Sequence, residues 1–398
     1  MAYRELEYYD MEYYDMEYRE LGRTGLTVSA VGMGCEGFEG KTQEESEKLM
    51  GAAMDAGICF FDMYTPSPAV RRAMGQALRA YPRERFVIQG HLCTDWQDGQ
   101  YVRTRKIEDV RRSFEQLLTD TGFGYIDIGM IHYCDTFDDL KSILTGDVMA
   151  YVESLKGQGV LRCIGLSTHN PDVVMQAVAS GEIDVIMMSI NPAYDMLPAS
   201  EDVDILFQQK TYDRVYAGID PKREAMYRAC QQNGVALTVM KPFAGGLLLS
   251  PEQSPFGKAM TPVQCISYCL DRPAVASVMG GMATVEEVKA AAAYNTATPE
   301  EKDYSLILSQ APRASFQGHC MYCGHCAPCP AGIDIAKVNQ FYDLSVAQGS
   351  APETVKDHYD RLGKGAGDCI GCGACEGRCP FQVAVREKMK EAARLFGR

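Results

Sequence analysis

Eight cysteines gather in residues 320–398 of this 398-residue chain, in two short series. The second series reads Cys369-x2-Cys372-x2-Cys375-x3-Cys379-Pro380. This spacing is typical of two-cluster 4Fe-4S sites, in which three thiolates bind one cluster and the fourth reaches the other. The first series is one residue shorter before its last cysteine and reads Cys320-x2-Cys323-x2-Cys326-x2-Cys329-Pro330.

Disulfides, zinc and iron–sulfur clusters compete as interpretations of these cysteines. Disulfides conflict with the reducing compartment that sixteen cysteines without an export signal indicate. Zinc is the serious alternative, but a four-cysteine zinc site usually uses two separated C-x2-C pairs. An unbroken x2 series fits a polymetallic core better, so we predict two 4Fe-4S clusters. We expect a crossed arrangement, with Cys379 joining Cys320, Cys323 and Cys326, and Cys329 joining Cys369, Cys372 and Cys375.

The elements that precede these cysteines alternate short apolar runs with amphipathic stretches. Eight runs resemble strands buried on both faces, namely residues 28–34, 58–62, 86–91, 126–132, 160–167, 185–191, 236–241 and 275–280. Helical stripes lie between them, and Gly57, Gly122 and Gly181 fall at expected helix ends. Eight strand–helix units over this length predict a (β/α)8 TIM barrel. A doubly wound open sheet is the alternative, weakened because no G-x-G-x-x-G turn follows the first strand.

Polar side chains stand at the carboxyl ends of these runs, where a TIM barrel carries its chemistry. In chain order they are Asp62, His91, His132, Ser167-Thr168-His169, Asn191, Lys241 and Gly280-Gly281. The convergence of several such ends predicts an active site at the barrel mouth.

The sequence resembles the aldo-keto reductases over residues 16–296. The opening Tyr18–Ser29 segment and the strand ends Phe60-Phe61-Asp62 and Asp127-Ile128-Gly129-Met130-Ile131-His132 are similar to motifs of that family, as are Ile164-Gly165-Leu166-Ser167 and Pro242-Phe243-Ala244-Gly245-Gly246-Leu247. One branch of the family carries a C-terminal dicluster ferredoxin-like domain, which residues 297–398 resemble. The resemblance implies a TIM barrel followed by a small, mostly helical, two-cluster domain. Residues 1–15 are expected to form a disordered acidic extension.

The family's catalytic tetrad of Asp, Tyr, Lys and His is only half present. Asp62 and His132 match, whereas Ser67 stands at the tyrosine position and His91 at the lysine position. Tyr64 is a nearby phenol, and His91 has a side chain suited to proton transfer at neutral pH. The candidate catalytic residues are therefore Asp62, Tyr64, His91 and His132.

The family's nicotinamide contacts are also incomplete. Ser167 remains, but Thr168 and Met187 replace the expected Asn and Gln, and residues 281–284 lack a basic clamp. The candidate cofactor-binding residues are Ser167, Thr168, Asn191, Lys241 and Gly280, with Lys241 as a phosphate contact. NAD(P)H is only weakly supported by this set.

The net charge of −14 argues against nucleic acid and anionic membranes as partners. No apolar stretch long enough for a membrane span is present, and we expect a cytoplasmic location. The leading hypothesis is an anaerobic oxidoreductase acting on a small organic substrate, with a ferredoxin or flavodoxin as electron partner. A degenerate barrel serving electron transfer or binding, and non-redox barrel chemistry with structural clusters, are the alternatives.

Anaerobically purified protein should contain about eight iron atoms and about eight acid-labile sulfides per chain, since each cubane holds four of each. Colorimetric iron and sulfide assays check this expectation. Two zinc ions without labile sulfide would contradict it.

Overall fold

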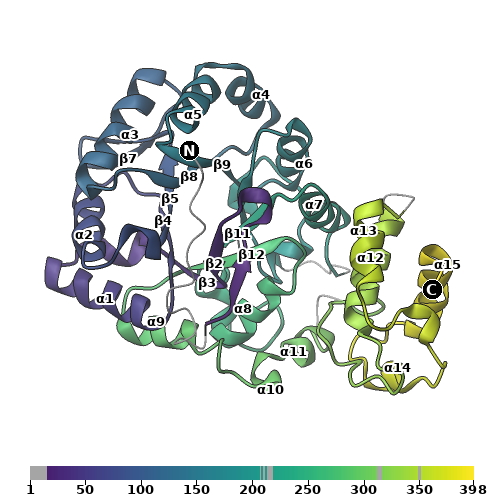
Figure 1. Cartoon of the computed structure of the whole chain (residues 1–398). Helices are drawn as coiled ribbons and strands as arrows, with labels where there is room; N and C mark the ends of the chain where they lie inside the picture. Colours follow the sequence, from purple (N-terminus) through teal and green to yellow (C-terminus); the bar gives the residue numbers. More distant parts are fainter. Residues whose placement is uncertain (1–15, 207, 209–210, 213–217, 312–315, 348–350) are drawn as a thin grey trace.

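The computed structural model describes residues 16–206, 208, 211–212, 218–311, 316–347 and 351–398. The extension predicted for residues 1–15 lies outside the described residues. Eight parallel strands close into a barrel surrounded by helices (Figure 1), which confirms the TIM-barrel fold. In chain order the barrel strands are β3 (Val31–Gly34), β4 (Phe60–Met63), β5 (Val87–Leu92), β8 (Ile126–Ile131), β9 (Leu161–Thr168), β10 (Val185–Ser189), β11 (Ala236–Met240) and β12 (Val275–Gly281).

The apolar runs form strands because the barrel buries both of their faces. Phe60, Ile128 and Val185 belong to the core inside the barrel, while neighbouring strand residues pack outward against the helices. The hairpin of β1 (Tyr18–Glu20) and β2 (Thr27–Ser29) adds residues to the same inner core, so it plugs one end of the barrel. A second hairpin, β6 (Thr94–Gln97) with β7 (Gln100–Arg103), follows β5 and carries Trp96.

The barrel helices alternate with the strands. They are α1 (Gln43–Asp55), α2 (Pro68–Leu78), α3 (Ile107–Thr121), α4 (Phe137–Thr145), α5 (Asp147–Gly157), α6 (Pro171–Ser180), α7 (Pro221–Gln232), α8 (Pro262–Leu270) and α9 (Val285–Ala292). Gly57, Gly122 and Gly181 adopt positive φ after helices, as the sequence predicts, because this conformation strains residues with a Cβ. No helix among the described residues is both long and apolar enough to cross a membrane.

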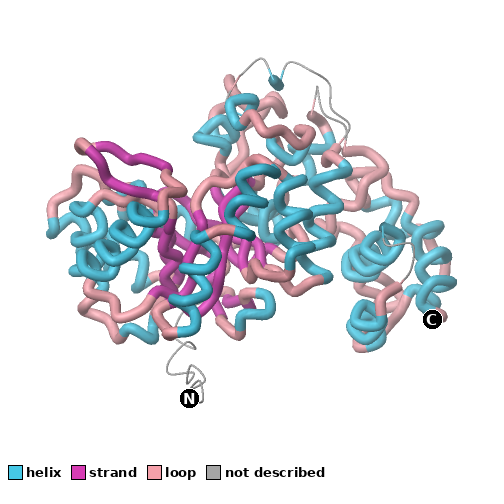
Figure 2. Tube along the Cα trace, turned by 90° about the horizontal axis from the view of Figure 1, so that it is seen from above, coloured by secondary structure: helices cyan, strands magenta, loops and turns pink. Residues whose placement is uncertain are grey.

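The C-terminal region lies to one side of the barrel (Figures 1 and 2). Its helices are α10 (Pro299–Lys302), α11 (Ser305–Ser309), α12 (Ile335–Ala347), α13 (Glu353–Asp360), α14 (Ala374–Arg378) and α15 (Val385–Phe396). Buried hydrogen bonds fasten this region to Arg272, which follows α8 of the barrel. Arg272 Nη2 and the Tyr304 hydroxyl both donate to the carbonyl oxygen of Met321, at 2.7 and 3.1 Å.

Gly75 lets α2 approach the end of α3 closely. A Cβ at Gly75 would lie 2.4 Å from the carbonyl oxygen of Thr121, whereas a Cβ at Gly51 in α1 would meet only the Tyr81 hydroxyl, at 3.9 Å. Gly75→Ala should therefore destabilise the protein by about 1–3 kcal/mol through overpacking.

Gly51→Ala is the matched control and should stabilise the protein by about 0.5–1 kcal/mol, because alanine favours helix. Thermal unfolding monitored by circular dichroism checks both variants. Equal shifts for the two would contradict the close approach.

Candidate active site and cluster-binding cysteines

Three neighbouring barrel strands place Asp62, His91 and His132 in one line at the barrel mouth. Asp62 lies in β4, His91 lies in β5, and His132 follows β8. His91 Nε2 lies 2.9 Å from Asp62 Oδ1, and His91 Nδ1 lies 2.7 Å from His132 Nδ1. Asp62 and His91 are 3 % and 2 % exposed. His132 is half-buried and forms the outer end of the line.

The hydrogen bonds of the Asp62 carboxylate determine which ring nitrogens of His91 and His132 carry protons. Asp62 accepts a hydrogen bond from Gln89 Nε2 at 2.7 Å and a second one from His91 Nε2. The Nδ1 atom of a neutral His91 is then an acceptor, so His132 Nδ1 donates to it. His132 Nε2 remains as the acceptor that faces away from this line. A proton added to the pair reverses the central hydrogen bond and turns His132 Nε2 into a donor.

Two tyrosine rings pack against His132. The Tyr64 ring stacks on His132 with centroids 6.3 Å apart, and Tyr101 of β7 meets His132 edge-on at 5.5 Å. Burial, followed by the charge of His91, holds the pKa of His132 well below its ordinary value. Burial and the nearby Cys35, Glu36 and Asp62 raise the pKa of the Tyr64 phenol. Tyr64 is therefore a weaker acid than a free tyrosine.

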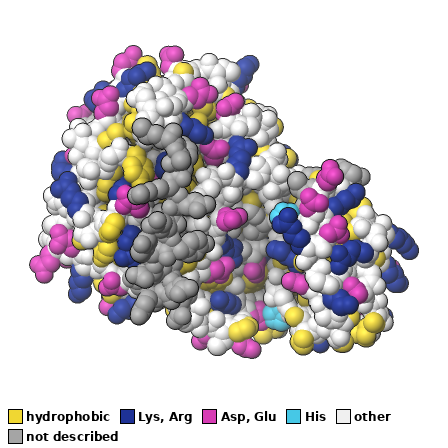
Figure 3. All heavy atoms as spheres, viewed as in Figure 1, with side chains coloured by type: hydrophobic (Ala, Val, Ile, Leu, Met, Phe, Trp, Pro, Cys, Tyr) yellow, Lys and Arg dark blue, Asp and Glu magenta, His cyan; other side chains and the backbone are white. Residues whose placement is uncertain are grey.

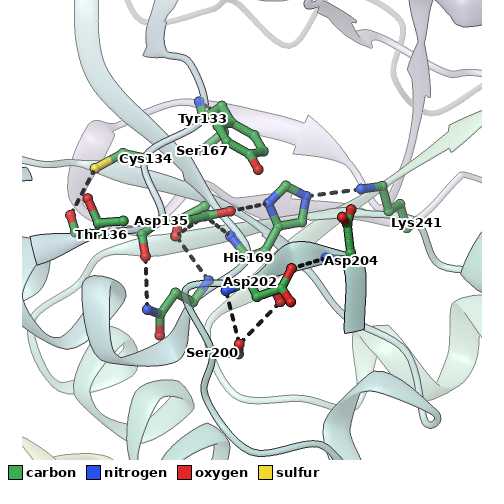
Figure 4. A network of polar contacts seen from close by, with 12 residues as sticks. Tyr133, Cys134, Asp135, Thr136, Ser167, His169, Ser200, Asp202, Asp204 and Lys241 are labelled. Atoms are coloured by element: carbon green, nitrogen blue, oxygen red, sulfur yellow. Dashed lines mark hydrogen bonds and ion pairs between the residues drawn. The ribbon is translucent and has the colours of Figure 1, made fainter. Parts of the chain in front are cut away.

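A second polar network lies at the mouth on the loops that follow β8, β9 and β11 (Figure 4). Asp135 Oδ2 accepts from His169 Nδ1 at 2.9 Å, and His169 Nε2 lies 3.0 Å from Lys241 Nζ. Burial alone would raise the pKa of Asp135, but hydrogen bonds from His169 and Thr168 outweigh it and lower the pKa. Burial lowers the pKa of Lys241 against the opposing effect of Asp135 and Glu36. In this network the Lys241 side chain is the cation, and Asp135 and Glu36 are the nearby carboxylates.

Most of the candidate cofactor residues are engaged within the protein. Ser167 Oγ accepts from the Tyr133 amide, Thr168 Oγ1 donates to Asp135, and Asn191 Nδ2 donates to the carbonyl oxygen of Lys241. Gly280 packs against Phe243 and Met282, as the position of its missing Cβ shows.

The Glu36 carboxylate also affects how well these residues fit a nicotinamide nucleotide. A Cβ built at Gly281 would lie 2.6 Å from Glu36 Oε2, so this carboxylate stands at the end of β12 where the family resemblance implies a cation for phosphate. These residues fit a nicotinamide nucleotide poorly.

The cysteines surround two separate cavities. The inner cavity has an open volume of about 320 Å³ and is lined by Cys320, Cys323, Cys326 and Cys379. The outer cavity has an open volume of about 340 Å³ and is lined by Cys329, Cys369, Cys372 and Cys375. The structure thus groups the eight thiols as the crossed arrangement requires, although the ligation itself stays a prediction.

The donor set of each cavity fits a 4Fe-4S cluster. All eight thiols are free, and the four in each cavity surround a space. Within the part of the chain that the structure describes, no three His, Cys, Asp or Glu side chains are placed to hold a single metal ion. A cubane needs four thiols spaced around such a cavity, because each binds a different iron, whereas zinc needs four thiols that meet at one ion. Asn339 Nδ2 also lies 3.4 Å from Cys320 Sγ, a hydrogen bond of the kind that tunes clusters.

Sequence reasoning missed Tyr133 and Asp135. Tyr133 adopts a φ of 51°, which is unusual for an aromatic residue, and its ring lies 5.4 Å from His169 and 6.2 Å from His132. It therefore links the two networks. The available signal was position, since both residues closely follow His132 at a strand end.

A closed barrel with ionisable side chains at its mouth, followed by a cysteine-rich region, defines a barrel enzyme joined to an iron–sulfur module. The sequence model of the aldo/keto reductase family matches residues 30–264, and that of the 4Fe-4S dicluster domain matches residues 319–384. The chain belongs to the aldo/keto reductase family. It is an oxidoreductase of this family with a 4Fe-4S domain.

Similar proteins agree with this family. An uncharacterized oxidoreductase, YqkF of Bacillus subtilis (strain 168), is 24% identical over 325 residues, which cover 76% of this chain and 98% of that protein. The NADH-specific methylglyoxal reductase of Escherichia coli (strain K12) is 23% identical over 57% of this chain and 68% of its own length. The fold matches the aldo-keto reductase AKR11C1 from Bacillus halodurans in its holo form, with a TM-score of 0.59 and 22% identity over 75% of this chain and 97% of that chain.

The lowered pKa of His132 predicts a pH-dependent stability. The unfolded chain protonates this histidine below about pH 6.5, whereas the folded protein keeps it neutral. Stability is therefore lost as the pH falls through about 6.5. His132→Asn should reduce that loss by up to about 1.4 kcal/mol per pH unit. Urea unfolding at pH 7.5 and 5.5 measures it, and identical losses in both proteins would contradict a depressed pKa.

Proposed function

We propose that the protein is an iron–sulfur oxidoreductase that reduces or oxidises a small carbonyl-like substrate at the barrel mouth, with electrons relayed by two 4Fe-4S clusters. The observation that carries this proposal is the unbroken line Asp62–His91–His132. Such a line delivers a proton to one point, which is the requirement for protonating a carbonyl oxygen. When bound, the clusters supply single electrons.

The protein's own residues manage the protons of this reaction. Conversion of a carbonyl to an alcohol takes up two electrons, one proton at the oxygen and one proton at the carbon, and solvent reloads the histidine line after each proton leaves it. His132 Nε2–H donates a proton toward the substrate oxygen, and His91 Nδ1–H then replenishes His132 across their 2.7 Å hydrogen bond. The Asp62 carboxylate stabilises the imidazolium of His91 while it holds this proton. Tyr64 orients the substrate by donating a hydrogen bond and does not ionise, because its pKa is raised.

A packed line of side chains between the inner cavity and the barrel supports a role for both in one reaction. The Tyr304 hydroxyl donates to the carbonyl oxygen of Met321, which lines the inner cavity. The Tyr304 and Tyr268 rings meet edge-on with centroids 5.3 Å apart. The Tyr268 hydroxyl donates to Asp195 Oδ2 at 2.8 Å. Asp195 belongs to the loop that follows β10 at the mouth, so the line reaches the wall of the candidate active site.

The same line continues from Asp195 to the histidines. The Asp195 amide donates to the carbonyl oxygen of Asn191, and Asn191 Nδ2 donates to that of Lys241, at 3.0 and 2.9 Å. Lys241 Nζ then lies 3.0 Å from His169. Contacts through Tyr133 complete the path to His132. These contacts connect the lining of the inner cavity with the residues that would handle protons.

Non-redox chemistry with structural clusters is the second candidate. The observation that favours it is the His91–His132 pair, which can move protons without any electron donor. A requirement for reductant separates the two functions.

The sixteen free thiols suit a reducing compartment, and we place the protein in the cytoplasm.

His91→Ala should lower turnover by about 100-fold or more, because it removes the middle of the proton line. The assay is anaerobic oxidation of reduced methyl viologen by a panel of 2-oxoaldehydes and hydroxyketones. Cluster absorbance should stay intact, which shows that electrons remain available.

His358→Ala is the matched control, because His358 is an exposed histidine on α13 and should leave the rate unchanged. Wild-type rates for His91→Ala would overturn the assigned role. Turnover that needs no reductant would instead establish the non-redox function.

A further inference from the structure

The two cysteine-lined cavities differ in their relation to the barrel. The inner cavity is lined by Met321, whose carbonyl oxygen accepts a hydrogen bond from Arg272 of the barrel at 2.7 Å. All lining residues of both cavities belong to the C-terminal region, so this hydrogen bond from the barrel is what distinguishes the inner cavity. The inner cavity is therefore the one tied to the barrel, and the outer cavity is the candidate for contact with a partner.

The outer cavity is also the more open of the two to solvent. Cys372 is exposed, and Ile370, beside Cys369, is 68% exposed. Ile370 is the most exposed large hydrophobic side chain in the described residues. An exposed apolar side chain beside a redox centre is a suitable point for a weak electron-transfer contact, which buries little surface.

Positive charge surrounds this exposed point. Residues 361–398 contain eight Lys and Arg but four Asp and Glu, a net of +4, whereas the rest of the chain carries −18. Three ion pairs lie within the segment, Asp368 with Lys364, Glu376 with Arg386 and Glu387 with Lys390, and they leave its net charge at +4 because each cancels one acid and one base. The segment is thus a basic surface on an acidic protein.

Helix α15 arranges part of this charge as a row. Arg386, Lys390 and Arg394 are exposed and four residues apart, so they share one helix face. Arg386 lines the outer cavity, so the row begins at the cysteines. The opposite face buries Met389 and Ala392. Figures 1 and 2 show α15 on the side away from the barrel, and Figure 3 shows Lys and Arg side chains along that outer edge.

We propose that the surface formed by Ile370, Cys372, Arg386, Lys390 and Arg394 docks a small acidic one-electron carrier protein of the ferredoxin type. This proposal rests on the proposed function, since it names the partner that supplies its electrons. Charge complementarity selects the occupant. An acidic carrier is repelled by the −18 remainder of the chain and is steered to the +4 segment, where the outer cysteines lie.

The test measures binding of an oxidised acidic two-cluster ferredoxin to the full-length, cluster-loaded protein by anaerobic biolayer interferometry. The affinity should fall steeply as salt is raised, because screening weakens the attraction. Lys390→Glu/Arg394→Glu should weaken binding at least tenfold. The control Lys48→Glu/Lys141→Glu changes the net charge equally through exposed lysines of α1 and α4, and should alter the affinity by about twofold at most.

A second measurement follows cluster reduction by stopped-flow absorbance. Reduced ferredoxin should reduce the clusters of Lys390→Glu/Arg394→Glu at least tenfold more slowly, while reduced methyl viologen should reduce them at the wild-type rate. Equal weakening by both double variants would overturn the docking surface. Reduction by methyl viologen without any binding or reduction by ferredoxin would overturn the partner and leave the proposed function standing. Failure of both reductants would remove the proposed function as well.

Discussion

Closure of eight parallel strands is the constraint that creates the active site. In a closed parallel barrel every strand points the same way, so all carboxyl ends meet at one rim. Asp62, His91 and His132 are separated by 29 and 41 residues along the chain, yet they become hydrogen-bond partners there. The register of β4 against β5 and of β5 against β8 sets their heights, since Asp62 pairs with Gln89 and His91 with Met130.

Burial determines the chemistry that the Asp62–His91–His132 line could perform. His91 is 2 % exposed, and the Asp62 carboxylate 2.9 Å from its Nε2 is the partner that offsets the cost of burying this polar ring. The family resemblance implies a lysine where His91 stands, and a lysine ammonium would hold its proton at neutral pH. An imidazole with two nitrogens can instead receive a proton on one side and pass it on from the other. The proposed function therefore assigns His91 a proton relay in place of the fixed charge of a lysine.

The C-terminal region depends on a different constraint, the sharing of two cysteine series between two cavities. Cys379 crosses to the cysteines of the first series, and Cys329 crosses to those of the second. Neither series completes a four-cysteine set alone, so the region must fold as one unit. Arg272 and Tyr304 then fix the inner cavity against the barrel through one backbone carbonyl. Two electron centres at different depths would follow from that asymmetry.

The sequence alone determined the barrel, because buried strands have to be apolar runs and helix ends favour glycine, as at Gly57 and Gly122. It also selected Asp62, His91 and His132, since strand-end polar residues are visible in one dimension. It could not reveal that the two histidines share a hydrogen bond, or that Tyr133 joins them to the Asp135–His169–Lys241 network. Nor could it show that Ser167, Thr168 and Asn191 are engaged internally. Side-chain partnerships across distant strands depend on register and rotamer, which only the closed barrel fixes.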